Sequence, residues 1–265
     1  MSLLRHGHRG LAVQQLQQRL NEAGAALAVT GLFDTPTEAA VRAYQLSRGL
    51  VVDGIAGEKT QAALAGFDLG RLLTHEALAI GADRLGVELP AMLAVNEVES
   101  LGMGFLTSGK PKVLFERHVL HRRLDAPLRD ALAERYPHLV NAEPGGYLGG
   151  DAEHTRLVLA QQLAGDAALE ATSWGAFQVM GYHAERLGYS SVPAFTELMA
   201  QHEHAQFEAF LRFVEADSTL HKALKAKRWA AFAERYNGPG YRRNLYDTKL
   251  ARAYERHAQA QQAAV

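Results

Sequence analysis

The chain has 265 residues, of which 48% are hydrophobic and 22% are charged, with no cysteine and a formal net charge of −1. This is the composition of an ordinary globular protein with one large or two smaller domains. Without cysteine there is no disulfide, no thiol nucleophile and no thiolate metal site. No apolar run is long enough to cross a membrane, and residues 1–9 lack the apolar stretch of a secretory signal, so we expect no signal peptide.

Positive charge is concentrated near the C-terminal end. Residues 219–265 contain ten lysines and arginines against three acidic residues, a net +7, so the rest of the chain carries about −8. A basic segment of this kind is typical of proteins with an anionic partner, such as a polymer or a membrane surface. A solvated helix face explains the same charges equally well, and the sequence leaves both interpretations open.

An internal repeat lies within residues 10–66. The segment Gly31–Thr37 matches Gly54–Thr60, and in both copies a glycine turn and a short loop lead to a threonine and a helix of small residues. Glycine provides turn geometry that other residues resist. Before the repeat, apolar residues recur at spacings of three and four from Val13 to Ala23, which predicts an amphipathic helix. Together these patterns predict a small three-helix domain.

This segment resembles the peptidoglycan-binding module of cell-wall hydrolases. Asp34 stands where that family often has glycine. The resemblance implies a non-catalytic domain over residues 1–68 that binds the wall polymer in a shallow groove between its helices. The residues that carry the resemblance are Gly10, Val13, Leu16, Gln17, Leu20, Gly24, Thr37, Ala40, Val41, Tyr44, Gln45, Gly49, Leu50, Asp53, Gly54, Gly57 and Thr60.

A short join at residues 66–74 leads to a second domain, expected over residues 72–265, that is dominated by helical patterns. A brief apolar run at residues 112–116 predicts a strand, and residues 141–150 predict a glycine-rich loop. The fold class is therefore mainly α, with room for one small β-hairpin. Helices are predicted over 74–85, 89–100, 117–136 with breaks at Pro127 and Pro137, 152–168, 175–187, 193–201, 203–216, 219–235 and 243–262.

The stretch from residue 89 to residue 100 predicts a buried helix. It is almost wholly apolar, Pro90 is acceptable in its first turn, and Gly102 does not favour its continuation. Two carboxylates, Glu97 and Glu99, stand at its C-terminal end. A carboxyl group in apolar surroundings keeps its proton more readily, which suits a general acid.

Only one of these two carboxylates can face a cleft, because residues two apart on a helix point about 200° away from each other. Glu99 shares its face with Met92 and Val95 and directly precedes Ser100. We therefore predict that Glu99 is the acid, and that Glu97 packs or forms hydrogen bonds on the opposite face.

Three short segments of the second domain, in this order, resemble the lysozyme-like superfamily of goose-type lysozymes and lytic transglycosylases. They are Glu99-Ser100, Ser173-Trp174-Gly175-Ala176-Phe177-Gln178 and Tyr236-Asn237-Gly238. Arg235 stands where many members have alanine. The wider runs Val98–Phe105 and Val113–His118 are similar to the N-acetylmuramidase domain of modular bacteriophage endolysins. That likeness covers roughly residues 75–262.

The resemblance implies cleavage of the β-1,4 bond between N-acetylmuramic acid and N-acetylglucosamine, with Glu99 as general acid. It also implies substrate binding by Ser173, Gln178, Tyr236 and Asn237. Glu116 is assigned to the substrate site as well and is the candidate second carboxylate, although a structural ion pair explains it equally well. If no second carboxylate exists, the substrate's own N-acetyl group assists, and the enzyme is a lytic transglycosylase that releases anhydro products.

Other functions are less well matched. A zinc amidase would need a histidine ligand set, but His202 and His204 lie on different helix faces and no His-Glu-x-x-His is present, so neither a metal nor another cofactor is predicted. An inactive wall-binding protein would have no need for Glu99, Gln178 and Asn237 together. We expect a monomer that binds bacterial peptidoglycan but not nucleic acid. Anionic outer membrane is the candidate partner of the basic C-terminal region, beside the alternative of a solvated helix face. The protein would stay in the host cytoplasm until its release to the periplasm and cell wall at lysis.

Overall fold

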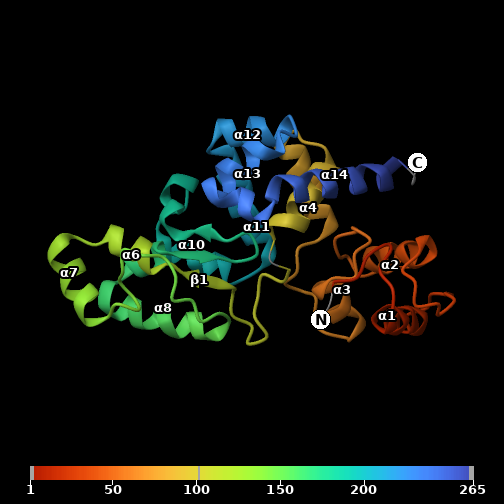
Figure 1. The fold of residues 1–265 in the computed structure, drawn as a ribbon, viewed down its shortest axis with the longest axis horizontal. Coiled ribbons are helices and arrows are strands. Elements are labelled where there is room, and N and C mark those ends of the chain that lie inside the picture. The colour runs from red at the N-terminus through yellow and green to blue at the C-terminus, as the bar shows by residue number, and fades with distance from the viewer. Residues whose placement is uncertain (1–2, 101, 263–265) are drawn as a thin grey trace. The chain divides into compact units, whose positions relative to one another are not determined.

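A computed structural model describes residues 3–100 and 102–262 (Figure 1). Helices dominate the described residues, which also contain a small antiparallel sheet of three strands, so the predicted mainly α fold is confirmed. The chain divides into two compact units, one made of residues 1–103 with 219–265 and the other of residues 104–218. Among the described residues, no helix has both the length and the apolar character that a membrane span requires.

The first unit begins with the predicted three-helix domain. Its helices are α1 (Leu11–Glu22), α2 (Thr35–Ser47) and α3 (Glu58–Leu64). Asp34 is the N-cap of α2, and its carboxylate accepts a hydrogen bond from the backbone N–H of Thr37 at 3.1 Å, so the departure from the family pattern has a structural role. The core is formed by buried side chains of both long helices, of the segment before α1 and of the two loops: Leu4, Val13, Leu16, Leu20, Phe33, Val41 and Ala56.

Two buried glutamines explain the internal repeat. The side chain of Gln17 accepts the N–H of Gly31 at 2.9 Å and donates to the carbonyl of Leu32 and to the hydroxyl of Thr37. In the second copy the same bonds connect Gln45 with Gly54, Ile55 and Thr60. Each amide thus supplies hydrogen-bond partners to the polar groups of one turn and to the threonine at the start of the following helix. Buried polar groups need such partners.

The helix predicted to be buried is α5 (Leu89–Glu99), and it lies at the centre of the first unit. It packs against α4 (His75–Leu85), which Thr74 caps, and against α14 (Tyr246–Gln262) near the other end of the chain. Between them in sequence come α12 (Ser218–Lys225), α13 (Trp229–Asn237) and a 3-10 helix (Pro239–Asn244). The prediction of one helix over 219–235 was wrong, because Lys227 adopts a left-handed conformation that ends α12.

The second unit contains the sheet β1 (Val113–Phe115), β2 (Thr172–Trp174) and β3 (Val179–Met180), paired in that order. Leu114 pairs with Ser173, and Ser173 pairs with Met180, so these side chains share one face. The opposite face of the sheet is buried in the core. The helices of the second unit are α6 (Arg117–Arg123), α7 (Ala126–Arg135), α8 (Asp151–Ala164), α9 (Asp166–Glu170), α10 (Val192–Met199) and α11 (Glu203–Glu215).

The helix predicted over residues 175–187 is absent. These residues form the β2–β3 turn, strand β3 and two 3-10 helices, Gly181–His183 and Glu185–Leu187. The turn needs left-handed backbone at Gly175 and at Gln178, where φ is +73° and +50°, and a helix cannot pass through two such residues. A side chain at Gly175 would also collide with Gln206, since its Cβ would lie 2.5 Å from that amide carbon.

Glu153 connects the glycine-rich loop with the sheet. It is fully buried and accepts hydrogen bonds from the backbone N–H groups of Leu148 and Gly149 and from that of Phe115 in β1. Its charge is balanced by Arg156, whose Nη1 lies 2.7 Å from the carboxylate. A buried carboxylate with this many donors is well satisfied, and it fixes the loop against the strand that precedes Glu116.

Candidate active site

Glu99 is the last residue of α5, and its side chain is only 7% exposed. The amide of Asn237, at the end of α13, donates a hydrogen bond from Nδ2 to Glu99 Oε1 at 3.0 Å. The first and the third motif of the sequence therefore meet in space, although they lie 138 residues apart. The Asn237 contact fixes the orientation of a carboxyl group that is otherwise enclosed.

Burial raises the pKa of Glu99 to about 7, while the hydrogen bond from Asn237 and the positive charge of Lys249 act in the opposite direction. The helix end contributes as well, because the partial negative charge there disfavours a carboxylate. At neutral pH a substantial fraction of Glu99 therefore carries a proton. A carboxyl group with a pKa near the working pH can both give and regain a proton, which is the requirement for general acid catalysis.

Two tyrosines complete the surroundings of this carboxyl group. Burial and the negative charge of Glu99 raise the pKa of Tyr236 well above its ordinary value, and they also raise the pKa of Tyr246. Tyr236 stacks on Phe232, one helical turn earlier, with ring centroids 5.6 Å apart. Neither Tyr246 nor Lys249 was predicted for the site. Both belong to α14, and no local sequence pattern indicates that this helix packs against α5.

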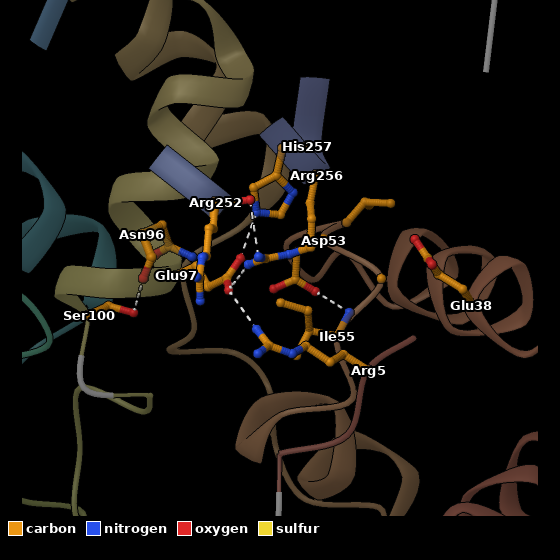
Figure 2. A network of polar contacts seen from close by, with 12 residues as sticks. Arg5, Glu38, Asp53, Ile55, Asn96, Glu97, Ser100, Arg252, Arg256 and His257 are labelled. Carbon is orange, nitrogen blue, oxygen red and sulfur yellow. Dashed lines mark hydrogen bonds and ion pairs between the residues drawn. The ribbon is translucent and has the colours of Figure 1, made fainter. Parts of the chain in front are cut away.

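Glu97 points to a different environment, as the helix geometry predicted (Figure 2). His257 Nε2 lies 2.9 Å from Glu97 Oε2, Arg256 binds Oε1, and Arg5 Nη1 lies 3.5 Å from Oε1. Burial alone would raise the pKa of Glu97, but the hydrogen bond from His257 and the charges of Arg256 and Arg5 bring it below its ordinary value. Glu97 is therefore an ion-pairing group.

The second motif forms the β2–β3 turn. The hydroxyl of Ser173 donates to Gln178 Oε1 at 2.7 Å, and Gln178 Nε2 donates to the carbonyl of Gly175 at 2.8 Å. Gln178 is one of three residues other than glycine with a positive φ among the described residues. Strain of this kind costs free energy and is common at functional sites. Much of the amide's hydrogen-bonding capacity holds the turn together.

Glu116 follows β1 and contacts a tyrosine and a histidine. The hydroxyl of Tyr147, from the glycine-rich loop, donates to Glu116 Oε2 at 2.8 Å, and His118 Nδ1 lies 3.1 Å from the same oxygen. The neighbouring Arg117 instead donates to the loop carbonyls of Glu143 and Pro144. Glu116 therefore takes part in fixing the loop, and its partner is not the arginine that the ion-pair alternative supposed.

The predicted site residues form two sets. Glu99, Tyr236 and Asn237 come together in the first compact unit, whereas Ser173, Gln178 and Glu116 belong to the second. Within residues 3–100 and 102–262, no three His, Asp or Glu side chains are grouped so that they could hold a metal ion. The chemistry that this geometry offers is proton transfer by Glu99.

Comparisons with known proteins identify the family of the chain. Residues 88–258 match the family described as N-acetylmuramidase, and residues 9–64 match that described as "Putative peptidoglycan binding domain". The crystal structure of the Burkholderia AP3 phage endolysin is similar, with a TM-score of 0.91 and 50% identity over 98% of this chain and 100% of that one. No curated protein matches the chain. Since the muramidase match alone covers more than half of the residues, the chain belongs to the N-acetylmuramidase family and is a peptidoglycan hydrolase with an N-terminal peptidoglycan-binding domain.

Proposed function

We propose that this enzyme hydrolyses the β-1,4 bond between N-acetylmuramic acid and N-acetylglucosamine, with Glu99 as the general acid. The observation that carries the proposal is the buried carboxyl group at the end of α5, whose pKa is raised to about 7. Cleavage of a glycosidic bond requires a proton on the leaving oxygen, and an ordinary surface carboxyl group has already lost its proton at neutral pH.

The hydrogen bond from Asn237 indicates which oxygen delivers the proton. Asn237 Nδ2 donates to Glu99 Oε1, so Oε1 acts as an acceptor and the acidic proton belongs on Oε2. Once Oε2 has given its proton to the leaving sugar, the group is an anion. The Asn237 N–H and the Lys249 charge then stabilise this anion, which allows Glu99 to release the proton despite its burial.

The water or the developing cation needs assistance from a second group. Glu97 is engaged by His257 and two arginines, so we do not assign it this role. Glu116 stays our candidate, as a carboxylate beside the sheet that carries Ser173 and Gln178. Inverting hydrolysis requires the two carboxyl groups to stand roughly 6.5–9.5 Å apart around a water. If Glu116 has no such role, the N-acetyl group of the substrate replaces it and the products are anhydro sugars.

We assign substrate binding to Tyr236 and Asn237 beside the acid and to Ser173 and Gln178 in the hairpin turn. An amide nitrogen has two N–H groups, so Gln178 can contact a sugar with the one that Gly175 does not use. We further propose that residues 1–68 hold the enzyme on the wall while residues 72–265 cut it. The enzyme would act as a monomeric endolysin that leaves the host cytoplasm at lysis, in line with the name of the similar phage protein.

Replacement of Glu99 by glutamine should abolish lysis of purified peptidoglycan and leave wall binding unchanged, because the amide has no acidic proton to give. Turbidity clearing and pelleting with insoluble walls measure the two properties. Mass spectrometry of fragments from the parent enzyme should show reducing muramic acid ends. Anhydro ends would show that the enzyme is a lytic transglycosylase and not a hydrolase. Free N-terminal stem peptides, or a Glu99→Gln variant with full activity, would contradict the proposal.

The raised pKa of Glu99 also predicts a pH-dependent stability. Between pH 4.5 and about 7 the unfolded chain releases this proton while the folded chain keeps it, so folding stability falls as pH rises through this interval. Glu99→Gln should therefore be more stable than the parent at pH 8, by up to about 3 kcal/mol, and equally stable at pH 4. Urea unfolding measures both values, with Glu22→Gln on the surface of α1 as the control. An equal stability of Glu99→Gln and parent at pH 8 would contradict the raised pKa.

We keep the proposal that basic residues near the C-terminal end touch anionic outer membrane, in a narrower form. The helix predicted over residues 243–262 contains four basic residues. Arg256 binds Glu97 and Lys249 acts on Glu99, whereas Arg243 and Arg252 are exposed and are available to an outside partner. Reversal of both to glutamate should lower the killing of intact Gram-negative cells several-fold and leave the activity on isolated walls unchanged. Equal killing by the parent and the reversed variant would dispose of this proposal.

A further inference from the structure

We propose that the peptidoglycan-binding domain does more than bind the wall: it positions the catalytic acid, because it holds the end of α5 on both sides of Glu99. Arg5 of this domain contacts Glu97, two residues before the acid, and Glu58 contacts Met103, four residues after it. The inference depends on the proposed role of Glu99. It assigns positioning roles to Arg5 and Glu58, neither of which touches the acid itself.

The first contact belongs to the charged group around Glu97, whose side chain is 12% exposed (Figure 2). Two arginines and a histidine from two parts of the chain meet this one carboxylate: Arg5 from the binding domain, and Arg256 and His257 from α14. The same helix α14 carries Lys249, whose charge lowers the pKa of Glu99, and Tyr246, whose own pKa is raised by burial and by the charge of Glu99. Glu97 thus connects the binding domain, the catalytic helix and the helix that surrounds the acid.

The second contact follows the end of α5. The backbone N–H of Met103 donates to Glu58 Oε2 at 3.3 Å, and Glu58 is the first residue of α3. Met103 also packs its side chain against the buried cluster of Leu50, Ala63 and Leu72. Gly102 has a φ of +73°, and a Cβ there would lie 2.7 Å from Glu58 Oε2, so the close approach depends on glycine.

The C-terminal end of a helix needs such support, because its last carbonyls have no partner within the helix. At the end of α5 the hydroxyl of Ser100 donates to the carbonyl of Asn96 at 2.5 Å, which closes the final turn locally. A cavity of about 170 Å³ lies beside it, lined by Asn96, Glu97, Ser100 and residues of the binding domain. The end of α5 is therefore not fully packed on this side, and polar contacts contribute to its position.

Two consequences follow for the acid. A shift of the helix end by about 1 Å would misplace the proton donor, and a misplacement of that size can cost about 100-fold in rate. The shift would also admit water to the carboxyl group, and loss of burial lowers the pKa of Glu99 toward its ordinary value. A domain that served only as a tether would influence neither property on a substrate too small to need the tether.

The test compares the full-length parent with the double variant Arg5→Ala/Glu58→Ala, which removes both contacts, on short soluble glycan oligomers and on insoluble walls. On soluble oligomers, we expect kcat to fall about tenfold with little change in KM, and the alkaline limb of the pH profile to move to lower pH. Arg9→Ala/Glu22→Gln, which changes two exposed charges of the same domain, should match the parent. Pelleting with walls and thermal unfolding verify that the binding domain of each variant is folded.

The conservative variant Arg5→Lys/Glu58→Asp should recover part of the lost kcat, since it keeps both charges. If the Arg5→Ala/Glu58→Ala variant retains the parent kcat and pH profile on soluble oligomers, the domain is only a tether and the inference is overturned. Glu99→Gln in the same assay separates the two ideas. An active Glu99→Gln contradicts the proposed catalysis, whereas an inactive Glu99→Gln beside a parent-like double variant contradicts the positioning role alone.

Discussion

The structure depends on the enclosure of one carboxyl group. Glu99 ends a helix that is buried along most of its length, and the cost of a charge there raises its pKa to about 7. Folding tolerates this cost because the group can stay protonated. Asn237 and Lys249 offset part of the effect of burial on the pKa of Glu99. The pKa is therefore high enough for the group to hold a proton near neutral pH and low enough for it to release that proton.

The same helix shows how two neighbouring glutamates receive opposite properties. Glu97 is also largely buried, yet its pKa lies below the ordinary value because His257, Arg256 and Arg5 surround it. For Glu99 the effect of burial exceeds that of the Asn237 hydrogen bond and the Lys249 charge, so its pKa rises. The two side chains point about 200° apart on the helix, so Glu97 faces Arg5, Arg256 and His257, whereas Glu99 lies beside Tyr236 and Tyr246. Glu97, which contacts the binding domain, and Glu99, the proposed acid, thus share one helix end without sharing partners.

Sequence patterns predicted the features that depend on neighbours along the chain. The almost wholly apolar run between Pro90 and Gly102 predicted α5 and its burial. The glycine and threonine spacing predicted the repeat that Gln17 and Gln45 explain. Two kinds of feature could not be predicted. The helix expected over 175–187 failed because the left-handed backbone at Gln178 is imposed by the turn and its bonds to Ser173 and Gly175. The α14 residues beside Glu99 were missed because only the fold brings them near. The catalytic role of Glu99 stays a prediction, which the sequence and the structure both support.

The central claim is that Glu99 holds a proton near neutral pH in the folded enzyme, and a direct titration tests it. Carbon-13 NMR of the glutamate side-chain carboxyl resonances, assigned by comparison with Glu99→Gln, gives the pKa of this one group. We expect the Glu99 resonance to titrate with a pKa of about 7. A midpoint near the ordinary 4.5 would mean that the carboxyl group is a solvated anion at neutral pH, and it would contradict the account.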